Sequence, residues 1–131
     1  MTPAPAIGVP TILVIEDYSD TRNLLSTLLR RQGYHVIEAE DGVEGLMKAS
    51  GKHPDLIIMD LTLPKMDGIE TARRIHQMPK LSGIPIFVLS AYLTDEIEAE
   101  VRAAGCVETF PKPFDTHALL KKVTAILGSA P

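Results

Sequence analysis

Short apolar runs alternate five times with longer segments of helical periodicity, and this alternation constrains the fold more than any other feature. The short runs span Thr11–Ile15, His35–Ala39, 56–59, 84–89 and 107–110. The helical segments span 20–31, 43–50, 69–78, 94–104 and 115–127. Strands that are mostly apolar along their length are typical of sheets covered on both faces. The alternation therefore predicts an α/β fold in which parallel strands are joined by right-handed crossovers, with helices on both faces of the sheet.

The first helical segment, 20–31, illustrates how helix ends and buried faces are predicted. Ser19 precedes it and is expected to cap its first turn, and Gly33 follows its last turn. A single apolar face is predicted for four leucines at helical spacing, Leu24, Leu25, Leu28 and Leu29.

The length of 131 residues corresponds to one ordinary domain. Residues 1–10 combine three prolines with small residues, and we expect them to form a flexible lead. The folded domain is predicted to span 11–128 and to be followed by a short tail, 129–131. We expect a single-domain protein, whose effect has to be delivered to another protein.

Charge and cysteine content exclude several classes of function. The chain has 13 Lys and Arg against 17 Asp and Glu, a net charge of −4. Because the sequence lacks a basic run, we expect no direct binding to nucleic acid or to an anionic membrane. The single cysteine, Cys106, cannot form an internal disulfide and is expected to be a small buried residue. Apolar runs too short for a membrane span and a start without signal-peptide features favour a cytoplasmic location.

Polar residues follow the predicted strands where each strand ends. Glu16 and Asp17 follow the first strand, Asp60 the third, Ser90 the fourth and Lys112 the fifth. In an open α/β sheet, ligands bind at the carboxyl ends of the strands. If the five strands had the order 2-1-3-4-5, which is known from other doubly wound sheets, the first and third strands would be neighbours and the three acids would share one pocket.

Three carboxylates in one pocket favour a bound cation, since they repel one another. Oxygen ligands suit Mg²⁺, with Mn²⁺ possible, better than Zn²⁺, which prefers His and Cys. A carboxylate can also act as a nucleophile that becomes an acyl phosphate. With a lysine and a hydroxyl nearby, the pattern favours phosphoryl transfer onto Asp60.

From residue 11 to about residue 127 the sequence resembles the receiver domain of bacterial two-component response regulators. The resemblance rests on ordered motifs: ILVIED at 12–17, DLIIMDLTLPKMDG at 55–68, PIFVLSA at 85–91, AGC at 104–106 and KPF at 112–114. It implies a doubly wound, flavodoxin-like (βα)5 fold, with a five-stranded parallel sheet in the order 2-1-3-4-5.

The resemblance also implies roles for individual residues. Asp60 is expected to be the phosphoacceptor, and Glu16, Asp17 and Asp60 are expected to hold Mg²⁺ together with the backbone carbonyl of Thr62. Ser90 is expected to hydrogen-bond one phosphoryl oxygen and Lys112 to pair with another.

The expected phosphoryl donor is a histidine kinase or a histidine phosphotransfer protein. Pro113 is expected to hold a cis bond that aims Lys112 inward. The chain is expected to promote its own phosphorylation and dephosphorylation without being a conventional turnover enzyme. A downstream target protein would bind the surface of the fourth helix, fifth strand and fifth helix. We expect a monomer or a weak dimer.

Two positions bear on how phosphorylation is transmitted to the protein surface and on how long the phosphoryl group persists. Thr109 stands where the family usually has an aromatic switch residue, three positions before the lysine. Phe110 cannot replace that residue, because adjacent strand residues point to opposite faces. We also hypothesise that Tyr92, two positions after Ser90, shields the phosphoryl group and slows its hydrolysis.

Simpler interpretations apply to each site residue taken alone. Glu16 and Asp17 could cap the first helix or lie in a solvated loop, Ser90 could hydrogen-bond nearby backbone groups, and Lys112 could be solvated.

The main rival function is a phosphorylation-independent docking module, which the residue Thr109 favours. A flavodoxin-like cofactor binder is remote, because no phosphate-cradling loop follows the first strand. The four histidines lack ligand spacing, so no histidine metal site is expected.

Overall fold

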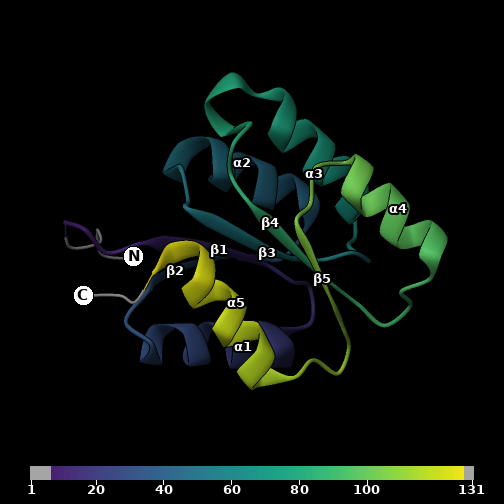
Figure 1. Cartoon of the computed structure of the whole chain (residues 1–131). Helices are drawn as coiled ribbons and strands as arrows, with labels where there is room; N and C mark the ends of the chain where they lie inside the picture. Colours follow the sequence, from purple (N-terminus) through teal and green to yellow (C-terminus); the bar gives the residue numbers. More distant parts are fainter. Residues whose placement is uncertain (1–6, 129–131) are drawn as a thin grey trace.

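Five parallel strands form one sheet in the computed structural model, which describes residues 7–128 (Figure 1). The strand order is β2-β1-β3-β4-β5, as predicted. The strands are β1 (Thr11–Ile15), β2 (His35–Ala39), β3 (Leu56–Asp60), β4 (Ile86–Ser90) and β5 (Glu108–Pro111). The helices are α1 (Ser19–Arg31), α2 (Gly42–Lys52), α3 (Gly68–Gln77), α4 (Asp95–Ala103) and α5 (Thr116–Leu127), with a short 3₁₀ turn, η1 (Pro79–Leu81). The predicted alternation is confirmed.

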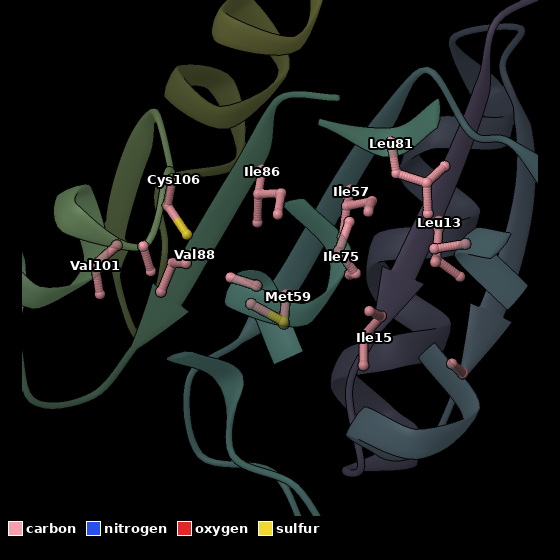
Figure 2. Packing of buried hydrophobic residues seen from close by; sticks show 14 of the residues in the cluster. Leu13, Ile15, Ile57, Met59, Ile75, Leu81, Ile86, Val88, Val101 and Cys106 are labelled. Carbon is pink, nitrogen blue, oxygen red and sulfur yellow. The ribbon is translucent and has the colours of Figure 1, made fainter. Parts of the chain in front are cut away.

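Helices cover both faces of the sheet, with α2, α3 and α4 on one side and α1 and α5 on the other (Figure 1). Successive strand residues point to opposite faces. Leu13 and Ile15 therefore join the core under α2, α3 and α4 that Figure 2 shows, whereas Ile12 and Val14 join the core under α1 and α5. Both cores are apolar, which explains why the strands lack a polar face.

Helix α1 differs from its prediction at two points. Ser19 is the first helical residue and makes no capping hydrogen bond; Tyr18 takes the cap position. A residue inside the helix already has helical dihedral angles and cannot act as the cap. Leu25 and Leu29 are buried as predicted, but Leu24 is 50% exposed, because the buried face is narrower than the run of leucines.

Strand β4 begins at Ile86, two residues later than predicted. Pro85 has no N–H to donate to a neighbouring strand, so the regular pairing of β4 begins only after it. Its carbonyl still accepts from the N–H of Ile57. The strand also extends one residue further than predicted, to include Ser90.

Acidic or hydroxyl side chains cap four helices and so set the loops at the carboxyl edge of the sheet. The caps of α2, α3, α4 and α5 are Asp41, Asp67, Thr94 and Asp115, and each accepts a backbone N–H three residues ahead. Asp67 thereby fixes the start of α3.

The ring of His76 ties α3 to two connecting segments. Its Nε2 lies 2.8 Å from the carbonyl oxygen of Ile84, and its Nδ1 lies 3.3 Å from that of Ala104. A Cβ at Gly105, where φ is +96°, would overlap this ring. His76 therefore has a structural position, away from the acidic residues.

The predicted tail, 129–131, and residues 1–6 of the predicted lead lie outside the described residues. Between residues 7 and 128, no helix has the length and apolar character needed to cross a membrane.

Candidate functional site

The carboxyl ends of β1, β3, β4 and β5 bring the predicted site residues to one edge of the sheet. The pairing of Ile15 with Met59 places Glu16 beside Asp60. The pairing of Ser90 with Pro111 places Lys112 just beyond the end of β4. Backbone pairing continues past the last strand residue, since Lys112 N–H donates to the carbonyl of Ser90 at 2.9 Å.

Three carboxylates converge at this edge. Glu16, Asp17 and Asp60 each offer an oxygen atom, and these atoms lie within 4.8 Å of one another. Glu16 is 1% exposed and Asp60 7% exposed, while Asp17 is exposed to solvent. The cluster therefore has two buried acids and one open side.

Lys112 points into the acidic cluster. Its Nζ lies 2.6 Å from Oε1 of Glu16 and 3.3 Å from Oδ2 of Asp60. The Lys112–Pro113 peptide bond is cis, as predicted. The interpretation of Lys112 as a solvated lysine is therefore wrong.

Burial and charge shift the pKa values of this pair. Burial raises the pKa of Glu16, and the charge of Asp60 adds to the rise, against hydrogen bonds from Lys112 and from the backbone N–H of Tyr18. Burial alone would lower the pKa of Lys112, but the hydrogen bond to Glu16 and the negative charges of Asp60 and Glu16 outweigh it, so the pKa is raised. The lysine is held as a cation.

Arg22 belongs to the site and was missed by sequence reasoning. From the first turns of α1, its Nη1 donates to the backbone carbonyl of Glu16 at 2.9 Å and to that of Asp17 at 3.4 Å. Its guanidinium also pairs with Glu38 and Glu40 on the β2 side. An arginine early in an amphipathic helix is ordinarily a solvated residue, so the sequence held no signal for this role.

The loop between β3 and α3 packs tightly against its neighbours. The N–H of Thr62 donates to Oδ1 of Asp60 at 3.3 Å, which orients that carboxylate. A Cβ at Gly42 would overlap the carbonyl oxygen of Met66. Lys65 forms an ion pair with Asp41 at 3.4 Å. The start of α2 therefore holds the loop that carries Thr62.

Ser90 and Tyr92 lie at the end of β4. The hydroxyl of Ser90 is buried and accepts the backbone N–H of Tyr92 at 3.1 Å. The Tyr92 side chain is 76% exposed. The hydroxyl therefore has a local backbone partner, and the aromatic ring lies at the surface.

Thr109 and Phe110 face opposite sides of β5, as predicted. Phe110 packs on Phe87 with ring centroids 5.5 Å apart, in the core under α1 and α5. The hydroxyl of Thr109 donates to Oε1 of Glu98 on α4 at 3.1 Å. A polar contact thus joins β5 to α4 at the position of the expected aromatic residue.

Cys106 is buried in the core under α4, and burial raises the pKa of its thiol to about 12. A protonated, enclosed thiol is a poor nucleophile. The prediction of a small buried residue is confirmed.

The donor set fits a hard divalent cation. Carboxylate oxygens are preferred ligands of Mg²⁺. Among residues 7–128, Lys112 is the basic side chain that pairs with this cluster, and its single charge balances only part of the charge of Glu16, Asp17 and Asp60. The three acids together could hold a metal ion.

The response regulator receiver domain family matches residues 12–124. The chain belongs to this family. As a receiver domain it is a component of two-component signalling, and its five-stranded sheet is the flavodoxin-like arrangement that the resemblance implied.

Similar proteins include regulators of different lengths. The receiver domain is 34% identical over 119 residues to the DNA-binding dual master transcriptional regulator RpaA of Synechocystis, and the match covers 91% of this chain but only 49% of RpaA. It is 29% identical over 120 residues to the polar-differentiation response regulator DivK of Brucella ovis, covering 92% of this chain and 98% of DivK.

Two solved structures have the same fold. The chemotaxis protein CheY4 of Vibrio cholerae has a TM-score of 0.86 at 30% identity, covering 90% of this chain and 98% of that chain. The receiver domain of the sensor histidine kinase PA1611 of Pseudomonas aeruginosa has a TM-score of 0.84 at 28% identity, covering 92% of this chain and 99% of that chain. That structure holds a magnesium ion in its active-site cleft.

Proposed function

We propose that this receiver domain accepts a phosphoryl group on Asp60 from a histidine kinase or a histidine phosphotransfer protein. The observation that carries the proposal is the convergence of carboxylate oxygens of Glu16, Asp17 and Asp60 within 4.8 Å of one another. The ammonium of Lys112 lies 3.3 Å from the carboxylate of Asp60. Three carboxylates this close repel one another, and Lys112 pairs with Glu16 and Asp60, so the cluster favours a further cation or a transferred group beside it. The family membership supports a kinase partner in general terms.

The transfer exchanges one bond for another at phosphorus. An oxygen of Asp60 attacks the phosphorus as the P–N bond of the donor phosphohistidine breaks, and the new O–P bond gives an acyl phosphate. The electron pair of the broken bond returns to the imidazole nitrogen, which takes up a proton. Positioning and charge neutralisation supply most of the catalysis in such reactions.

Residues of this chain supply the neutralising contacts. The ammonium of Lys112, 3.3 Å from Asp60, pairs with one phosphoryl oxygen, and the hydroxyl of Ser90 hydrogen-bonds another. Glu16, Asp17, Asp60 and the carbonyl of Thr62 would hold Mg²⁺, with Mn²⁺ as the alternative. When bound, the metal ion supplies further neutralisation of the phosphoryl charge.

Phosphorylation is proposed to switch the surface of α4, β5 and α5 for binding of a target protein. Once phosphorylated, Asp60 draws Ser90 toward the phosphoryl oxygen, and Ser90 lies on the strand next to β5. Because Thr109 bonds Glu98 on α4, the relay in this chain runs through a polar contact in place of an aromatic ring.

Acetyl phosphate provides the direct test. Incubated with acetyl phosphate and Mg²⁺, the protein is expected to gain the mass of one phosphoryl group, and Asp60→Asn is expected to gain none. Asp67→Asn is the matched control, since Asn retains the cap of α3 and this variant should be phosphorylated normally. No mass gain in the wild type, with a competent kinase also tried, would favour the phosphorylation-independent docking module.

A further inference from the structure

A groove of about 340 Å³ lies between α3 and α4, which are neighbours on the same face of the sheet (Figure 1). Leu61, Ile69 and Ile97 line it, and all three side chains are partly buried against the core under these helices. Pockets that enclose small molecules range from about 300 to 1,000 Å³, so this groove is at the small end. Its apolar surface suits inserted side chains better than a whole cofactor.

Acidic side chains stand at the edges of the groove. Asp67 and Glu100 line it, and Glu96 lies one helical turn before Glu100 on the same flank of α4. Within residues 7–128 these three carboxylates have no basic partner, because the ion pairs there involve other acids.

The opposite wall of the groove carries two arginines against one glutamate. Glu70 pairs with Arg74 at 2.9 Å and lies 4.0 Å from Arg73, which also lines the groove. The uncompensated negative charge is therefore concentrated on the α4 side and at the end near Asp67.

Helix α4 separates this groove from the proposed switching surface. Glu98 faces β5, where it accepts a hydrogen bond from Thr109. Glu100 lies on the other flank, toward α3. The groove and the surface of α4, β5 and α5 are thus distinct surfaces that share one helix.

The acids of the groove do not form a metal site. Among the described residues, the carboxylates close enough to hold an ion together are those of Glu16, Asp17 and Asp60. The groove therefore combines apolar contact with spread negative charge, and the chemistry complementary to it is an apolar side chain flanked by cations.

We propose that the α3–α4 groove docks a basic amphipathic segment of a partner protein. An apolar side chain of that segment rests on Leu61, Ile69 and Ile97, and its lysines or arginines meet the carboxylates of Glu96, Glu100 and Asp67. Leu61 follows Asp60 directly, so the segment lies beside the phosphoacceptor. Docking requires no phosphorylation and is tested on the unmodified protein.

The test uses a fluorescein-labelled helical peptide with leucines one turn apart and flanking lysines, titrated with wild-type protein and followed by anisotropy. Glu100→Lys is expected to raise the Kd about fivefold, because a charge pair with the peptide is lost and the new lysine repels the lysines of the peptide. Asp95→Lys, an equal charge change at the exposed start of the same helix, is expected to leave the Kd nearly unchanged. A matched peptide with Ser in place of Leu is expected to bind far more weakly.

Amide chemical shifts of labelled protein locate the peptide. Shifts confined to residues 61, 67–73 and 96–101 would support the proposal. Absence of binding, equal losses in Glu100→Lys and Asp95→Lys, or shifts spread over the acidic surface would overturn it. A concentration-dependent dimer with shifts in the groove would assign the groove to a second copy of this chain and would also overturn it.

Discussion

The Nζ atom of Lys112 lies 2.6 Å from Oε1 of Glu16, although 96 positions separate the two residues in the chain. Glu16 is 1% exposed and burial raises its pKa, while the hydrogen bond from Lys112 is the strongest contact that acts against this rise. Lys112 thus stabilises the acidic cluster, in addition to its proposed pairing with a phosphoryl oxygen.

Replacement of Lys112 should therefore lower the stability of the protein when no metal ion is bound. Lys112→Ala is expected to lower the free energy of unfolding by about 2 kcal/mol in the presence of EDTA, because a buried charged hydrogen bond is lost. Added Mg²⁺ should restore part of the loss by supplying another cation. Urea unfolding measures both effects, with the exposed Lys121→Ala as control; a Lys112→Ala protein as stable as wild type in EDTA would contradict this role.

Arg22 is expected to affect metal binding without being a ligand. Arg22→Gln removes the donors that hold the backbone carbonyls of Glu16 and Asp17, so the acids lose their fixed positions. The Kd for Mg²⁺ should rise about tenfold, as for other supports of metal ligands. Calorimetric titration gives the value, and Arg31→Gln at the exposed end of α1 should match wild type. An unchanged Kd in Arg22→Gln would refute the role.

Asp41 should contribute to stability in a pH-dependent way. The pKa of the Asp41 carboxyl is lowered from its usual value of about 4, first by the hydrogen bond from the backbone N–H of Glu44 and then by Lys65. The ionised group therefore stabilises the fold above about pH 4, and this contribution is lost as the pH falls through the lowered pKa. Asp41→Asn keeps the cap but removes the charge, so its urea midpoint should fall less than that of wild type between about pH 5 and pH 2. Asp95→Asn serves as control, and parallel curves for Asp41→Asn and wild type would be evidence against the prediction.

Tyr92 is predicted to set the lifetime of the phosphorylated form. The backbone N–H of Tyr92 donates to the hydroxyl of Ser90, and its ring lies at the surface. We expect the ring to limit the approach of water to the acyl phosphate. Tyr92→Ala should shorten the half-life of phosphorylated Asp60, measured by the decay of intact mass after removal of acetyl phosphate. Tyr18→Ala, which removes another exposed ring, should decay like wild type. Equal half-lives for Tyr92→Ala and wild type would disprove the shielding hypothesis.

Much of the site could be predicted from the sequence because it depends on backbone topology. A polar residue at the end of a buried parallel strand has to lie at the carboxyl edge of the sheet, and this rule placed Glu16, Asp60 and Ser90 correctly. Side-chain contacts between elements could not be predicted in the same way. The role of Arg22 depends on how α1 packs beside β2, and the misplaced cap at Ser19 depends on a one-residue shift in where α1 begins.

The sequence by itself determined the alternation of strands and helices and the set of residues at one edge of the sheet, since periodicity and strand ends are local properties of the chain. Only the tertiary structure decided that Lys112 contacts Glu16 more closely than Asp60, that Thr109 bonds Glu98, and that an acid-rimmed groove opens between α3 and α4. These relationships join different elements of the fold, and their distances are set by how the helices and strands pack together in three dimensions.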